Sequence, residues 1–141
     1  MLRDEFEAVG ERDPEDLLAA YEAVLRDVIE DRGTETVAAE TEIDEDRLSA
    51  LVAGDSPDLT LEEAAAILAT DPDRPDADFL VADARDMLLM GMSNAVLDVE
   101  AIQSGIDSRL EAKEIQQKVE GRYPMTLAEY ALLHGYIESR K

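Results

Sequence analysis

Helix start signals recur along the whole chain, and they constrain its fold more than any other feature. At Asp13-Pro14 a candidate N-cap carboxylate precedes a proline, which suits the first helical position. Three later segments have the spacing of a capping box, in which a hydroxyl and a Glu carboxylate satisfy free amides of the first turn. They are Thr60 with Glu63, Ser108 with Glu111, and Thr126 with Glu129. No segment alternates apolar and polar residues as a half-buried strand would. The sequence therefore predicts an all-α protein without a sheet.

Apolar residues between these signals follow helical spacing. The clearest stripe includes Leu17, Tyr21, Leu25 and Val28, and Gly33 then ends that helix. We expect about seven helices in all. The candidate segments number eight, some of them short, and lie near 14–33, 34–41, 44–54, 60–68, 76–91, 98–106, 108–120 and 126–139. Ser93-Asn94 is expected to break or kink the chain after Gly91.

A proline-rich segment at 71–75 divides the chain. Asp71-Pro72-Asp73-Arg74-Pro75 cannot continue a helix, so it is the best candidate for a boundary. We expect a helical lobe at 1–75 and a C-terminal helical lobe at 76–141, packed together as one compact unit. We detect no internal repeat in the sequence.

The segment 34–53 has the apolar spacing of a helix-turn-helix unit. Two short helices that cross steeply need apolar and small residues at fixed places. Val37 and Ala38 fit the first helix, Ile43 follows the turn, and Leu48 and Leu51 fit the second helix. On these residues the segment 14–70 resembles a Cro/C1-type helix-turn-helix domain, and the resemblance implies that residues 34–53 read DNA.

Two departures from that pattern leave the function of the unit open. Glu42 stands where the turn usually has glycine, and a positive φ there would cost roughly 1 kcal/mol. The end of the second helix that would face DNA is acidic, whereas base and phosphate contacts use cations and amides. The DNA-facing candidates are Asp44, Arg47, Ser49 and Ala50. We favour a degenerate unit that serves as a scaffold or contacts protein, with DNA-binding transcription regulation as the alternative.

The chain is strongly acidic, with 35 acidic and 13 basic residues and a formal net charge of −22. The basic residues are ten Arg and only three Lys. Self-repulsion of this size destabilises a compact chain at ordinary ionic strength, but at 1 M salt the screening length is only about 3 Å. The composition resembles that of haloarchaeal proteins, so we expect a high-salt environment. The alternatives are an acidic nucleic-acid mimic and an ordinary acidic regulator.

Most of the chain also resembles an uncharacterised haloarchaeal family with a conserved domain of unknown function. The resemblance rests on segments such as Arg47-Leu48-Ser49-Ala50-Leu51 and Thr60-Leu61-Glu62-Glu63-Ala64-Ala65. It implies a halophilic cytoplasm and brings no known activity and no catalytic residues.

The acidic excess belongs entirely to the first hundred residues. Residues 1–100 carry 29 acidic and 7 basic side chains, whereas residues 101–141 carry six of each. A neutral, aromatic surface on such a chain suggests contact with a protein partner or a second copy. The candidate contact residues are Arg109, Lys113, Tyr123, Tyr130, His134, Tyr136 and Ile137. The alternatives are ordinary salt bridges and, less favoured, a nucleic-acid site. Met87, Met90 and Met92 are interpreted as core filling, with an adaptable binding surface as the alternative.

Nothing in the sequence predicts an enzyme. Cysteine is absent and His134 is the single histidine, which excludes thiolate sites and disfavours a His-based triad. The acidic run at 71–78 is interrupted by two prolines and lacks calcium-loop spacing, and no phosphate-binding glycine loop occurs. We therefore predict no catalytic, cofactor-binding or metal-binding residues.

Two segments bear on localisation. The weakly charged stretch 87–97 is too short to span a membrane. Charged residues at Arg3, Asp4, Glu5 and Glu7 are unlike a signal peptide. We expect a small cytoplasmic regulatory or protein-interaction module.

Overall fold

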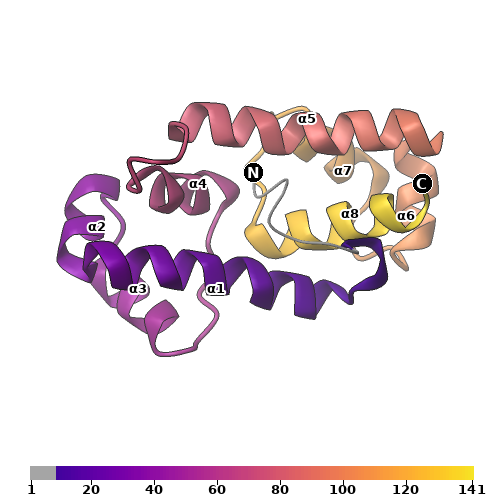
Figure 1. Cartoon of the computed structure of the whole chain (residues 1–141). Helices are drawn as coiled ribbons and strands as arrows, with labels where there is room; N and C mark the ends of the chain where they lie inside the picture. The colour runs from indigo at the N-terminus through magenta and orange to yellow at the C-terminus, as the bar shows by residue number, and fades with distance from the viewer. Residues whose placement is uncertain (1–8) are drawn as a thin grey trace.

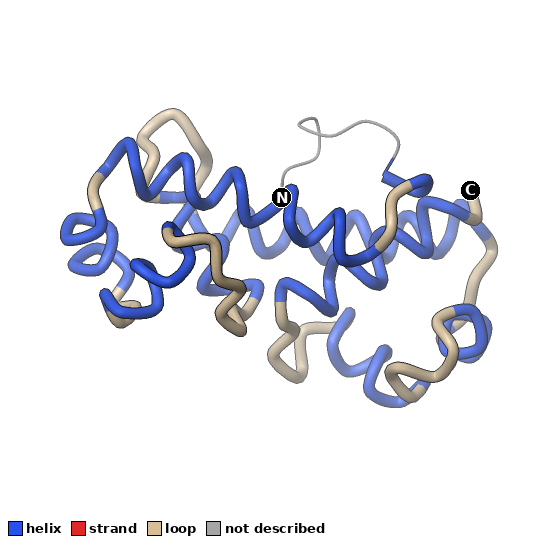
Figure 2. The backbone as a smooth tube through the Cα atoms, turned by 90° about the horizontal axis from the view of Figure 1, so that it is seen from below, coloured by secondary structure: helices blue, strands red, loops and turns tan. Residues whose placement is uncertain are grey.

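The computed structural model describes residues 9–141 and is all-helical in that range, which confirms the predicted fold class. A 3₁₀ turn at Val9–Glu11 precedes eight α-helices (Figures 1 and 2). They are α1 (Pro14–Arg32), α2 (Thr34–Thr41), α3 (Glu45–Val52), α4 (Leu61–Ala69), α5 (Ala77–Ala95), α6 (Val99–Gly105), α7 (Ala112–Val119) and α8 (Leu127–Ser139). The charged residues Arg3, Asp4, Glu5 and Glu7 lie outside the described residues.

Most predicted helix starts are correct. Thr60 with Glu63 and Thr126 with Glu129 form complete capping boxes at α4 and α8. Asp13 occupies the N-cap of α1, but its side chain accepts no cap hydrogen bond. The predicted start at Ser108 is wrong, because Asp107 and Ser108 both have positive φ, 57° and 58°. The chain turns there, and α7 begins at Ala112 after a box formed by Glu111 and Glu114.

The predicted break after Gly91 is also wrong, because α5 continues to Ala95. Gly91 is buried where α5 meets α8, and a Cβ atom on it would lie 2.6 Å from Ile137 Cγ2. The glycine therefore permits close helix packing instead of ending the helix. Tertiary contact outweighs its weak helix propensity.

The second half of the chain repeats the helix order of the first. In each half a 19-residue helix is followed by two short helices and then by a helix that starts with a Thr–Glu capping box. The third helix of each half ends at a glycine with positive φ, Gly54 and Gly121. In both halves this glycine and an arginine of the long helix donate to the same carbonyl: Gly54 and Arg26 to Leu51, Gly121 and Arg85 to Lys118. The structure thus contains a repeat that sequence inspection missed.

The two halves are related by an approximate two-fold axis (Figure 1). At its centre Thr60 and Thr126 form an antiparallel bridge. Two equivalent hydrogen bonds flank the bridge, from Leu61 N to Met125 O at 2.7 Å and from Leu127 N to Leu59 O at 2.9 Å. The long helix of each half packs on the last helix of the other, α1 on α8 and α5 on α4. One continuous hydrophobic core therefore joins the two expected lobes.

Candidate functional site

The α2–α3 unit has the boundaries that its sequence predicts and a strained turn. Glu42 takes φ 62° and ψ 15°, the left-handed conformation in which its side chain is unfavourable. Thr41 Oγ1 donates to Val37 O at 2.7 Å and accepts from Ile43 N at 3.3 Å, which holds the turn together. Asp44 then caps α3 by accepting from Asp46 N at 2.9 Å.

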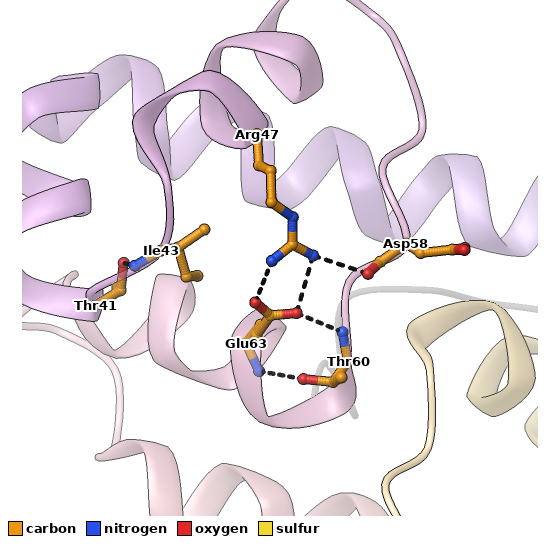
Figure 3. A network of polar contacts seen from close by, with 6 residues as sticks. All are labelled: Thr41, Ile43, Arg47, Asp58, Thr60 and Glu63. Atoms are coloured by element: carbon orange, nitrogen blue, oxygen red, sulfur yellow. Dashed lines mark hydrogen bonds and ion pairs between the residues drawn. The ribbon is translucent and has the colours of Figure 1, made fainter.

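Arg47 connects α3 to the start of α4 (Figure 3). Its two terminal nitrogens donate to both carboxylate oxygens of Glu63, at 2.5 and 3.0 Å, and Nη2 also donates to Asp58 O at 2.8 Å. Glu63 Oε1 accepts from Thr60 N at 3.0 Å as part of the capping box. The guanidinium is therefore held by three acceptors of its own chain.

The pKa values of Arg47 and Glu63 support a structural role for this network. The Glu63 hydrogen bond raises the pKa of Arg47 above its ordinary value. Burial opposes ionisation of Glu63, but hydrogen bonds from Arg47 and Thr60 outweigh it and hold the pKa of that carboxyl below its ordinary value. Of the four DNA-facing candidates, Asp44 and Ser49 are exposed, Ala50 is half-buried, and Arg47 points to α4. The network stabilises the fold and engages the one candidate cation of α3 with acceptors of its own chain, although the Arg47 side chain stays partly exposed.

A different surface stands out on α5, where large apolar side chains face solvent. Phe79 is 56% exposed, Leu89 42% and Met90 57%. The interpretation of Met90 as core filling is therefore wrong, whereas Met87 and Met92 are half-buried. The spacing of positions 79, 82, 86, 89, 90 and 93 places them along one side of the helix. We call the exposed residues of this side, Asp78, Phe79, Ala82, Asp86, Leu89, Met90, Ser93 and Asn94, the α5 outer face.

The repeat supplies an internal comparison, because α1 is the equivalent of α5. Counted from the first helical residue, the exposed positions of α1 match seven of those on α5. On α1 they hold five acids and two alanines: Glu15, Asp16, Ala19, Ala23, Asp27, Glu30 and Asp31. On α5 the same positions hold only two acids, Asp78 and Asp86. The two helices hold equivalent places in the fold, so that place alone does not explain why the exposed positions of α5 are largely uncharged or apolar.

The C-terminal end of α5 continues this surface. Val96 follows the helix with φ 54° and is 90% exposed, whereas the equivalent position after α1 is Gly33 with φ 91°. Beside Val96 lies an open groove of about 530 Å³, lined by Leu89, Met92, Ser93, Val96, Leu97 and Asp98. An exposed β-branched residue in a left-handed conformation is rare, and such strain clusters at functional sites.

A family model matches residues 17–140, which is nearly the whole chain. The chain belongs to a family of unknown function, DUF5791. The matched range spans both halves of this DUF5791 member and includes the Arg47 network and the α5 outer face. No curated protein and no solved structure matches the chain. The resemblance of residues 14–70 to a Cro/C1-type domain therefore stays a prediction.

The structure of this DUF5791 member separates the seven predicted contact residues into two groups. Arg109, Lys113 and Tyr123 are exposed, and Tyr136 is half-buried against Gly105. Tyr130, His134 and Ile137 are buried in the core. These three residues contact other helices of the same chain, which corrects the expectation that they belong to an exposed surface.

The buried histidine belongs to an aromatic cluster between α1 and α8. Tyr21 Oη and His134 Nδ1 are hydrogen-bonded at 2.9 Å, and the Tyr130 ring lies 5.2 Å from the His134 ring, centroid to centroid. Burial lowers the pKa of His134 to about 4 and raises that of Tyr21, so both groups are neutral near pH 7. A neutral imidazole and a neutral phenol share this hydrogen bond without a buried charge, so the pair stabilises the core.

Within residues 9–141, no three His, Cys, Asp or Glu side chains are grouped as a metal site would require. In the same range, no helix is both long and apolar enough to cross a membrane.

Proposed function

We propose that the chain is a protein-interaction module that contacts its partner through the α5 outer face. The observation that carries this proposal is the difference between α1 and α5. The same exposed positions are acidic on one helix and largely uncharged or apolar on the other. Exposed apolar patches with a polar rim are typical of protein contact surfaces. Methionine suits such a surface because its flexible side chain adapts to a partner.

The Arg47 network favours protein contact over the alternative of DNA reading by residues 34–53. Base and phosphate contacts need cations or neutral amides at the exposed end of the helix. Here Arg47 is held by Glu63 and Asp58, while Asp44, Glu45 and Asp46 are exposed around the start of α3. Negative charge at that end repels the phosphate backbone. We therefore propose that the α2–α3 unit is a scaffold.

A high-salt environment would suit this function. A formal net charge of −22 opposes close approach of another acidic protein in dilute buffer. At 1 M salt the Debye length falls to about 3 Å, and this repulsion is largely screened. Burial of apolar area does not need an attractive charge, so it remains available under those conditions.

The test is co-purification in multimolar KCl from cells of the source organism. Tagged wild type is compared with a Leu89→Asp/Met90→Asp variant and with an Ala19→Asp/Ala23→Asp control, which adds the same charge to the exposed positions of α1. Circular dichroism first checks that all three are equally helical. We expect the wild type and the control to retain the same partner and the α5 variant to lose it. Equal retention by all three would contradict the proposal.

A further inference from the structure

We infer that the partner of the α5 outer face is a second copy of this chain, in an antiparallel α5–α5 contact with its two-fold axis near Met90. This inference rests on the proposed function and names its partner. The low charge of this face, and the positions of Asp86 and Asn94 on it, fit a second copy.

The outer sides of α1 and α5 differ in the charge that they would bring into a contact between two copies. The exposed positions of α1 carry five carboxylates, so pairing through that side would bring them into a contact, where salt screens charges much less than on an open surface. The α5 outer face carries Asp78 near one end and Asp86 near its middle, with Leu89, Met90, Ser93 and Asn94 following without charge. An isologous contact between two α5 faces brings together two carboxylates from each copy instead of five.

The order of residues along α5 favours one register of the antiparallel contact. Asp86 and Asn94 lie four residues before and four residues after Met90, which is about 6 Å along the helix in each direction. A two-fold axis near Met90 therefore places each Asp86 opposite Asn94 of the second copy. The Asn side-chain amide can donate a hydrogen bond to the carboxylate. The two-fold contact therefore gives each of its two Asp86 carboxylates a hydrogen-bond donor, Asn94 of the other copy. An axis at Asp86 itself would instead oppose two carboxylates, and this register is excluded on charge.

The same register also covers the C-terminal end of α5. With the axis near Met90, the first half of the second copy's α5 extends past Ala95 and over Val96. The open groove of about 530 Å³ lies there, between Leu89 and Asp98. This placement covers Val96, the most exposed apolar side chain named on the surface. It gives the exposed valine a contact that Gly33 could not make at the end of α1.

Sedimentation velocity of the purified chain in multimolar KCl tests the inference over a wide concentration range. We expect a monomer–dimer equilibrium for the wild type and the same equilibrium for the Ala19→Asp/Ala23→Asp control. Leu89→Asp/Met90→Asp should raise the dissociation constant by more than about tenfold, because it buries unpaired carboxylates at the centre of the contact. Asn94→Asp should weaken pairing several-fold by opposing two carboxylates across the axis.

Two outcomes overturn self-pairing. One is a wild-type monomer at every concentration. The other is a dimer that the α5 variants and the α1 control affect equally. Either outcome leaves the proposed function to its own test, because co-purification reports a different partner even when the chain does not pair with itself. Loss of both self-pairing and α5-dependent co-purification would refute both proposals.

Discussion

Replacing Val96 with glycine should stabilise the folded monomer, although it removes an apolar side chain. Val96 has φ 54°, a left-handed conformation that costs an L-residue about 1–2 kcal/mol. The side chain is 90% exposed, so its truncation loses only about 0.2 kcal/mol of burial energy, a tenth of what full burial contributes. Glycine adds about 0.5–1 kcal/mol of backbone entropy to the unfolded chain. The net expectation is a gain of about 0.5–1 kcal/mol.

Urea unfolding at fixed KCl measures this gain as a higher midpoint at unchanged slope. In a thermal scan, a domain of this size should melt about 2–3 °C higher, from about 2 cal/mol/K of unfolding entropy per residue. Both measurements are made in the Met90→Asp background, so that self-pairing does not add to the apparent stability. In the Met90 wild type the same substitution should weaken pairing, because Val96 lies in the proposed contact.

Gly33→Val is the matched control at the equivalent position after α1. A Cβ atom there would meet only Thr36 Oγ1 at 3.9 Å, so there is space for it and the φ of 91° decides the outcome. We expect this variant to lose at least about 1 kcal/mol. A destabilised Val96→Gly monomer would refute the assignment of strain to Val96.

Three further predictions concern the interior and the Arg47 network. Arg47→Ala should lower the free energy of unfolding by about 1–2 kcal/mol in urea, and Arg47→Lys should recover less than half of it, since lysine cannot make the forked contact with Glu63. Gly91→Ala should destabilise by about 1 kcal/mol, because overpacking against Ile137 outweighs the helix propensity gained; a stabilised variant would contradict the packing account. The pKa of His134 is near its ordinary 6.5 in the unfolded chain and about 4 in the folded chain. As the pH falls from 6.5 to 4, the free energy of unfolding should therefore decrease by about 3 kcal/mol. His134→Gln should lack this part of the pH dependence, and identical pH profiles would contradict the assigned pKa.

The predictable part of the fold came from local chemistry. The capping boxes at Thr60 and Thr126 and the Asp44 cap depend on residues two or three positions apart, so the sequence alone indicates them. The failures have a tertiary cause. Gly91 reads as a helix end until α8 is seen packed against it, and Ser108 reads as a cap until its positive φ is known.

The repeat was hidden for a related reason. Its halves share positions of caps, glycines and buried residues while their surface residues differ, as the exposed positions of α1 and α5 show. Positions 54–63 and 121–129 share a glycine, a proline and a Thr-Leu-x-Glu segment, which was the available signal. It is short, and one residue fewer separates the proline from the threonine in the second half.

The candidate site was predictable only in part. Charge counting located a neutral region after residue 100, but within residues 9–141 most of the large exposed apolar side chains lie before it, on α5 and at its end. Tyr130 and Ile137 were expected on a surface because a stripe of apolar residues does not reveal which side of a helix the core covers. The structure shows α8 buried between α1 and α5, and so moves the candidate surface to α5.

Cysteine cross-linking tests the contact between two α5 faces most directly, because the chain contains no cysteine. Single variants Met90→Cys and Asp27→Cys place one thiol at equivalent positions on α5 and α1. A disulfide requires Cα atoms within about 7 Å of each other, which only a residue near the two-fold axis satisfies. With mild oxidant in multimolar KCl, we predict rapid formation of a covalent dimer by Met90→Cys and little by Asp27→Cys. Equal, slow cross-linking of the two variants would contradict pairing through α5.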